Sequence, residues 1–202
     1  MSLFITFEGA DGCGKTTQIE LLDKYLKEKG FKTLVTREPG AKGLGEKLRE
    51  ILLNYDGEVS PTCESFLFLA DRAQHVDCII KPALKNGIIV LCDRHTDSTV
   101  AYQGYGRKLD IEQIKKLNNI AVSGLKPDLT IVFDIDIETS MQRVGSTKDR
   151  MESAGIDFFK RVREGFLTIA ENEPERVKVI NSADTIENIH KQVIKLVEEK
   201  NG

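Results

Sequence analysis

The chain has 202 residues, enough for one α/β domain with a substantial core. Its 29 basic and 32 acidic side chains leave a net charge of −3, which excludes a general attraction to nucleic acid or to an acidic membrane surface. The sequence opens with no signal pattern and holds no apolar run long enough to span a membrane, so we expect a cytoplasmic protein.

Five short apolar runs are predicted to be strands, with helical patterns between them. The runs cover residues 3–7, 33–36, 88–92, 129–133 and 177–180. They are nearly continuous rather than alternating, which is typical of a parallel sheet covered on both faces. We therefore expect an α/β fold, a five-stranded parallel sheet with helices on both faces. No repeat or linker divides the chain, so 1–202 is predicted to be a single domain.

Helix boundaries are marked by stop and capping signals. Residues 15–29 carry an apolar stripe and are predicted to form a helix that stops at Gly30. Three further helix starts are predicted at Ser60-Pro61, at Asp110 with Gln113, and at Asp184 with Glu187. Four cysteines occur without a C-x-x-C pair or a zinc spacing. We interpret them as reduced thiols, and three of them as core residues because their neighbours are apolar.

The stretch GADGCGKTT, residues 9–17, follows the first predicted strand and matches the phosphate-binding P-loop pattern. Glycines let successive backbone N–H groups point at an anion, and the following helix adds its positive end. Lys15 would reach the β- and γ-phosphates of a nucleotide, and the Thr16 hydroxyl would bind Mg²⁺. A chance glycine-rich turn is the alternative, and the strand before and helix after disfavour it. We assign nucleotide binding to Gly9, Ala10, Asp11, Gly12, Cys13, Gly14, Lys15, Thr16 and Thr17.

Two clusters follow in chain order. TREPG, residues 36–40, ends the second predicted strand and would extend Arg37 and Glu38 into the same crevice, although a solvated turn is the default for such a segment. In FLFLADR, residues 66–72, Phe68 and Arg72 are four apart and share a helix face. A ring beside a guanidinium could hold a base by stacking and edge hydrogen bonds. A core phenylalanine with a surface arginine is an equal alternative.

The segment LCDRHTDSTVAYQGYG, residues 91–106, follows a buried strand. Asp93 therefore stands near the place where a second Mg²⁺-holding carboxylate is needed. Arg94 beside it could grip a phosphate with two parallel hydrogen bonds. The alternative is a salt-bridged pair that ends the strand.

The segment MQRVGSTKDRMES, residues 141–153, gathers Arg143, Lys148 and Arg150 around Gly145 and Ser146. A mobile basic flap could close over transferring phosphates and exclude water. From composition alone, a solvated charged loop is the favoured alternative.

Taken together, these segments resemble the thymidylate kinase family over almost the whole chain. FEGADGCGKTTQ, TREPG, FLFLADR, DRHTDSTVAYQG, KPDLTIVFDID and DRMES…FFKRVREGF occur in that family's order and approximate spacing. The resemblance implies phosphorylation of dTMP to dTDP with ATP and Mg²⁺, in deoxythymidine nucleotide biosynthesis. It also implies a homodimer with a P-loop kinase fold and a small mobile lid at about 141–153.

The resemblance also implies roles around the acceptor nucleotide. Phe68 would stack on thymine and Arg72 would bond the base edge. Ser98 and Gln103 would line the base pocket, and Tyr102 would lie under the deoxyribose and disfavour a 2′-hydroxyl.

The phosphates would be held by a second group of side chains. Arg94 and Arg37 would hold the acceptor phosphate, with Asp11 near it. Some family members carry an arginine inside the P-loop and others supply cations from the lid. Gly12 stands at the loop position here, so the chain resembles the type in which Arg143 and Arg150 act from the lid.

Two departures from the family pattern and three rival functions need to be considered. His95 stands where the family often has tyrosine or phenylalanine, and AKG at 41–43 replaces a more usual glycine-threonine turn. A kinase for another nucleoside monophosphate is the nearest rival. A GTPase switch would need a guanine-reading N-K-x-D sequence, which this chain lacks. The third rival is an inactive structural relative, which the intact Lys15, Thr16, Asp93 and Arg94 disfavour.

Cys13 lies inside the phosphate loop and has two interpretations. It is either a reactive thiol, activated by the helix N-terminus and Lys15, or a shielded filler.

Overall fold

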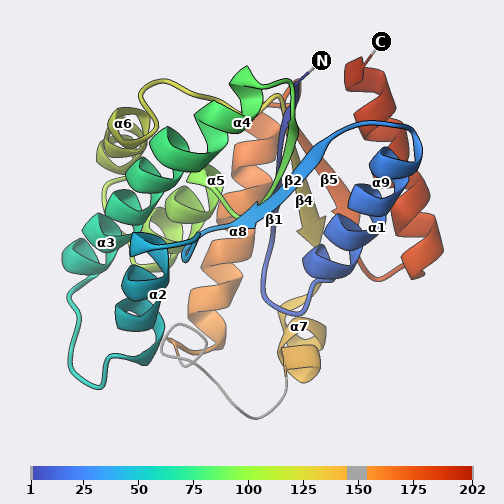
Figure 1. Ribbon diagram of the computed structural model, residues 1–202. Helices are drawn as coiled ribbons and strands as arrows, with labels where there is room; N and C mark the ends of the chain where they lie inside the picture. The colour runs from blue at the N-terminus through green and yellow to red at the C-terminus, as the bar shows by residue number, and fades with distance from the viewer. Residues whose placement is uncertain (1, 145–153, 202) are drawn as a thin grey trace.

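The computed structural model describes residues 2–144 and 154–201, and within them five strands form one parallel sheet (Figure 1). The strands are β1 (Phe4–Glu8), β2 (Thr33–Arg37), β3 (Ile89–Asp93), β4 (Leu129–Asp134) and β5 (Val177–Asn181). Their order across the sheet is β2-β3-β1-β4-β5. All five predicted strands are confirmed, and each extends one residue further at its carboxyl end than the apolar run did, because that last residue is polar. In β2 and β3 this residue, Arg37 and Asp93 respectively, lines the cleft described below.

One face of the sheet is covered by α1 (Lys15–Glu28) and α9 (Ile186–Asn201), which pack against each other (Figure 1). Their apolar stripes bury Leu22, Leu26, Val193 and Val197 against the strands. Burial of such side chains stabilises the fold by about 1.5–3 kcal/mol each.

The other face carries most of the remaining helices. They are α3 (Pro61–His75), the π-helix η1 (Val76–Ile80), α4 (Lys81–Lys85), α5 (Thr96–Thr99), the π-helix η2 (Val100–Gly106), α6 (Ile111–Ala121) and α8 (Ile156–Asn172). α2 (Leu44–Asn54) packs on α3, and α7 (Ile137–Val144) contacts α8. Helices therefore cover both faces of the sheet, as the sequence predicted.

The predicted helix starts are confirmed at two of three places. The Ser60 hydroxyl and the Asp110 carboxylate each accept a hydrogen bond from the backbone N–H three residues on. The start predicted at Asp184 is wrong by one residue, because the Thr185 hydroxyl accepts the N–H of Asn188 at 3.2 Å and α9 begins after it. Asp184 instead accepts the Asn188 side-chain amide at 2.9 Å.

The four cysteines are free thiols, but only Cys13 and Cys92 are buried. The prediction of three core cysteines is therefore wrong. Cys63 lies in the first turn of α3 and Cys78 lies in η1, and both are exposed. Apolar neighbours in sequence do not place a residue on the inner face of a helix, since only one stripe of the helix surface meets the core.

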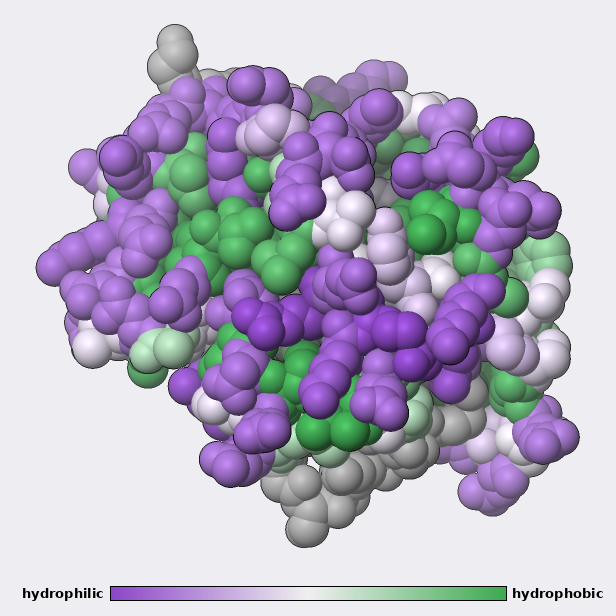
Figure 2. All heavy atoms as spheres, turned by 180° about the vertical axis from the view of Figure 1, so that it is seen from behind, coloured by the Kyte–Doolittle hydropathy of each residue, from purple (hydrophilic) through white to green (hydrophobic). Residues whose placement is uncertain are grey.

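None of the helices in the described part of the chain combines the length and apolar character needed to cross a membrane. In the view from behind, hydrophobic residues form separate patches among hydrophilic ones (Figure 2).

Candidate active site

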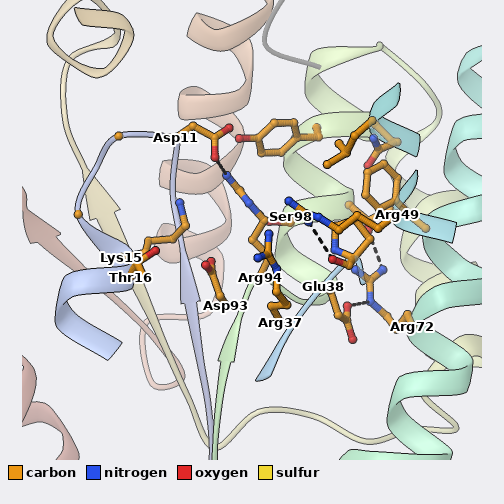
Figure 3. Close-up of a pocket in the computed structure, with 18 of the residues that line it drawn as sticks. Asp11, Lys15, Thr16, Arg37, Glu38, Arg49, Arg72, Asp93, Arg94 and Ser98 are labelled. Carbon is orange, nitrogen blue, oxygen red and sulfur yellow. Dashed lines mark hydrogen bonds and ion pairs between the residues drawn. The ribbon is translucent and has the colours of Figure 1, made fainter. Parts of the chain in front are cut away.

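The carboxyl ends of β1, β2 and β3 open onto a cleft of about 470 Å³ (Figure 3). Most of the residues predicted from sequence line it: Asp11, Gly12, Gly14, Lys15, Thr16, Thr17, Arg37, Phe68, Arg72, Asp93, Arg94, Ser98, Tyr102, Gln103 and Arg143. Parallel register explains part of this, because the Cα atoms of Phe7, Asp93 and Arg37 are paired across the three strands. The structure thus brings together segments that lie far apart in the sequence.

The loop after β1 closes around its own lysine. Gly9 has φ +133°, and a Cβ there would lie 2.5 Å from the Phe133 carbonyl oxygen, so a larger residue does not fit. Gly14 has φ +93° and leads directly into α1. The Lys15 ammonium donates to the Gly9 and Ala10 carbonyls at 3.1 and 2.9 Å, which holds its positive charge inside the loop.

Cys13 does not line the cleft, although its sulfur accepts a hydrogen bond from the Lys15 ammonium at 3.6 Å. It is 1% exposed and belongs to the hydrophobic core that α1 covers. A Cβ added to Gly9 would lie 3.0 Å from its sulfur, so the thiol also fills the space beneath the loop. Of the two interpretations of Cys13, the geometry supports the shielded filler.

Arg94 is the central cation of the cleft. It has φ +67°, a conformation that L-residues rarely adopt, and its guanidinium reaches back over the loop. It donates to the Asp11 carboxylate at 2.7 Å and to the Gly9 carbonyl at 2.9 Å, and it lies 5.0 Å from the centre of the Tyr102 ring. Burial opposes ionisation of Asp11, but the charges of Arg94 and Lys15 outweigh it and lower the pKa of Asp11 to about 2. Asp11 is therefore a carboxylate at neutral pH.

Asp93 does not pair with Arg94, which argues against the simple salt-bridged strand end. One of its carboxylate oxygens is buried and takes no hydrogen bond from the described residues. Leaving such an oxygen unpaired is costly unless a cation meets it. Thr16, at the start of α1, is exposed and lines the same cleft. A hydroxyl and a carboxylate are oxygen donors of the kind that Mg²⁺ takes, so the residues present fit that ion.

Glu8 supports the segment after β3, and sequence reasoning missed it. Its fully buried carboxyl group accepts the His95 backbone N–H at 2.7 Å and the Ser98 hydroxyl at 2.5 Å. Burial, together with nearby Asp97, raises the pKa of Glu8 to about 7. Ser98 also accepts a hydrogen bond from Arg94 at 3.3 Å, so this contact helps to hold the guanidinium in place.

Arg72 is fully buried at the other end of the cleft, which excludes the surface-arginine alternative. Its Nε donates to Glu38 at 2.8 Å and its Nη2 to the His95 carbonyl at 2.8 Å. Its Nη1 donates to Thr99 and to Asn118, both at 2.6 Å. Phe68, one helical turn earlier on α3, is half-buried and also lines the cleft.

Gln103 and Tyr102, both on η2, complete this end. The Gln103 amide nitrogen donates to the Glu64 carboxylate at 2.9 Å. The Tyr102 ring meets the Phe166 ring at a 6.2 Å centroid distance, and its hydroxyl is buried with no partner among the described residues. Burial raises the pKa of Tyr102, which keeps the hydroxyl protonated.

The remaining cations stand at the rim. Arg37 is exposed at the end of β2, and the exposed Arg143 on α7 donates to the Gly12 carbonyl at 3.5 Å. Arg49 of α2 also lines the cleft and donates to the Pro39 carbonyl at 2.9 Å, and sequence reasoning missed it. Lys148 and Arg150, predicted for the lid, lie outside the described residues, as does most of 141–153.

Comparisons with known protein families, sequences and structures all find thymidylate kinases. A family model described as thymidylate kinase matches residues 7–193. A thymidylate kinase from Geotalea daltonii is 48% identical over 197 residues, covering 93% of this chain and 92% of the relative. One from a Sulfurihydrogenibium species is 48% identical over 201 residues, covering 99% and 98%. The solved thymidylate kinase of Ehrlichia chaffeensis superposes with a TM-score of 0.81 at 39% identity, covering 97% of this chain and 98% of that one.

Proposed function

This chain belongs to the thymidylate kinase family, and from that premise we propose that it transfers the terminal phosphoryl group of ATP to dTMP, giving dTDP for nucleotide biosynthesis. The observation that carries the proposal is a single cleft with a phosphate loop at one end and Phe68 with Arg72 at the other. We treat 1–202 as one thymidylate kinase domain, which the family match over 7–193 supports.

The donor end follows from the loop geometry. ATP would place its β- and γ-phosphates against the loop N–H groups, and the Lys15 ammonium would leave its carbonyl partners to meet them. Thr16 and Asp93 are proposed to hold Mg²⁺, which when bound neutralises charge on the phosphates. Arg143, at the rim beside Gly12, would lie against the adenine and near the phosphates. Arg150 is proposed to act on the transferring group.

The acceptor phosphate is already an oxyanion, so its attack needs no general base. Catalysis then consists of positioning and electrostatic stabilisation in an in-line transfer. Arg94 can offer two parallel N–H groups to that phosphate, and Arg37 adds charge from the rim. Asp11 keeps the Arg94 guanidinium directed into the cleft through the 2.7 Å contact.

The base and sugar are assigned to the opposite end of the cleft. Phe68 would stack on the thymine ring, while Arg72, Ser98 and Gln103 would border its polar edge. Tyr102 would lie under the deoxyribose, where its buried ring leaves little room for a 2′-hydroxyl.

A homodimer in the cytoplasm completes the proposal. Exposed hydrophobic side chains on three helices of one side of the molecule support a second copy as partner: Ile51 of α2, Phe66 of α3 and Ile120 of α6. Light scattering at micromolar concentration would give the mass of two chains if this is correct, and the mass of one chain if it is not.

The function is tested by coupled detection of ADP with ATP, Mg²⁺ and each of dTMP, dCMP, dAMP and dGMP. We expect turnover with dTMP to exceed that with the other three by at least about 100-fold, and to stop when EDTA removes the metal. A preference for another base would favour the rival nucleoside-monophosphate kinase, and ATP hydrolysis independent of any acceptor would favour a nucleotide switch.

A further inference from the structure

Most hydrogen-bond donors of Arg72 are already used within the protein, so few are left for a ligand. A guanidinium carries five N–H groups and no acceptor. Four of the five in Arg72 are used by Glu38, Thr99, Asn118 and the His95 carbonyl. The fifth, on Nη2, has no partner among the described residues, and Arg72 lines the cleft. The side chain therefore presents one donor to a bound base and cannot turn to present another.

Glu38 is what holds that orientation. Its carboxylate is buried and receives Arg72 Nε on one oxygen (Figure 3). The other oxygen receives both His75 Nδ1 and His95 Nδ1, at 2.9 and 3.0 Å. Burial opposes its ionisation, but the neighbouring His95 and Arg72 side chains hold the pKa of Glu38 well below its usual range. A carboxylate only accepts, so each histidine must present its Nδ1–H. His75 is fixed further, because its Nε2 lies 2.7 Å from the Thr36 hydroxyl.

Gln103 is oriented in the same way by a second buried acid. The Glu64 carboxylate pairs with Arg107 through two N–H groups, at 3.2 and 3.1 Å. Because a carboxylate paired with a guanidinium accepts hydrogen bonds, the Gln103 nitrogen must face it. The Gln103 carbonyl oxygen is left as the polar atom that the cleft can use, and it takes no hydrogen bond from the described residues. Gln103 is thus held as an acceptor.

One fixed donor and one fixed acceptor match the edge of only some bases. Thymine and uracil carry a keto oxygen beside a ring N–H, which is an acceptor beside a donor. Cytosine carries an amino group beside an unprotonated ring nitrogen, which reverses both. Cytosine would therefore place its amino group against the Arg72 N–H, a donor against a donor. It would also place its ring nitrogen against the Gln103 carbonyl, an acceptor against an acceptor.

We propose that Glu38 and Glu64, with His75 and His95, are positioning residues that fix the hydrogen-bond polarity of the base pocket and so exclude cytosine. The proposal rests on the assigned dTMP kinase function. It gives His95 a role that an aromatic residue at this position could not perform, since phenylalanine has no donor for Glu38 and a tyrosine hydroxyl would lie elsewhere.

The decisive variant is Glu64→Gln, in which residue 64 can donate as well as accept and the Gln103 amide is free to turn over. Steady-state kinetics with dTMP, dUMP and dCMP should show kcat/KM falling for dTMP and dUMP together. The ratio of kcat/KM for dTMP over dCMP should fall by at least about tenfold, with the KM for ATP unchanged. Substitution of a residue that merely stabilises the fold would lower kcat/KM for all three nucleotides by the same factor. An unchanged ratio in the folded variant overturns the proposal.

A matched pair at His95 provides the second arm. Asparagine can place an N–H where Nδ1 stands, whereas phenylalanine keeps the ring and removes the donor. His95→Phe should therefore lower the dTMP-to-dCMP ratio and His95→Asn should retain it, with His190→Asn on α9 as a neutral control. Equal losses in both His95 variants contradict the proposal, and this pair decides it if Glu64→Gln does not fold. Wild-type enzyme that fails to phosphorylate dTMP would instead contradict the assigned function.

Discussion

The two ends of the cleft are built differently. At the phosphate end, Lys15 is held by carbonyls five and six residues earlier in its own loop. At the base end, the four partners of Arg72 come from 23 to 46 residues away in sequence. The phosphate end is therefore a local backbone structure, and the base end is a buried charged network that exists only in the folded chain. Substitutions should separate the two, with chemistry lost at the first end and stability lost together with specificity at the second.

Arg72→Met tests the base end most severely. It removes the guanidinium and leaves the Glu38 carboxylate buried beside two histidines. Breaking a buried pair in this way costs about 3–5 kcal/mol of unfolding free energy. Chemical denaturation would measure the loss, with the exposed Arg37→Met as the matched control. A loss of unfolding free energy below about 1 kcal/mol would contradict the claim that the base end, unlike the phosphate end, is needed for stability.

Lys15→Ala tests the phosphate end. Loss of its charge from the transition state should lower kcat by at least about 100-fold, equivalent to about 3 kcal/mol, because the contact strengthens as charge develops on the transferring group. The free energy of unfolding should change by less than about 1 kcal/mol, since the lysine bonds only to its own loop. Lys24→Ala, on the exposed side of α1, is the control. Near-normal turnover would refute the assignment of the loop.

Glu8 lies between the two ends, and its ionisation should make stability depend on pH. Because the folded pKa of about 7 exceeds the ordinary glutamate pKa of 4.5, the native state binds the proton more tightly than the unfolded chain. The stabilisation is complete below the unfolded pKa and is lost as pH rises toward 7, by about 2 kcal/mol between pH 5 and 7. Glu8→Gln mimics the protonated form and should lack this loss. Subtracting its unfolding free energies from those of wild type isolates the effect, and parallel pH profiles would contradict it.

Arg143→Ala should give the smallest effect. Its side chain is exposed and its contact with the Gly12 carbonyl is long, at 3.5 Å. We expect a mixed change of a few-fold in kcat and in the KM for ATP, worth about 1 kcal/mol or less, with stability unchanged. Initial rates at varied ATP would measure it. A loss as large as that of Lys15→Ala would make Arg143 part of the central machinery rather than of the rim.

The same contrast explains what the sequence could predict. The strands and the phosphate loop were predictable because apolar runs and glycine spacing are local signals. The partners of Arg72 were not, because no spacing in the sequence links Glu38 to Asn118, and even the burial of Arg72 stayed open. His95 was noticed as a departure from the family, but its hydrogen bond to Glu38 requires the tertiary structure.

Helix faces were predicted less well for a related reason. The π-helices η1 and η2 interrupt the 3.6-residue period after Val76 and Val100 respectively, so the inner face cannot be extrapolated along the chain. Cys78 in η1 is exposed, although its sequence neighbours are apolar. Gln103 in η2 lines the cleft.

The central claim is that one cleft holds the donor phosphates at the loop and the thymine base at the Arg72 end. A crystal structure with dTMP, Mg²⁺ and a non-hydrolysable ATP analogue tests it most directly. We expect the acceptor phosphate to lie about 3 Å from the Arg94 guanidinium, the γ-phosphate to lie equally near Lys15, and the thymine ring to stack on Phe68. A thymine ring bound away from both Phe68 and Arg72, or an acceptor phosphate that does not reach Arg94, would contradict it.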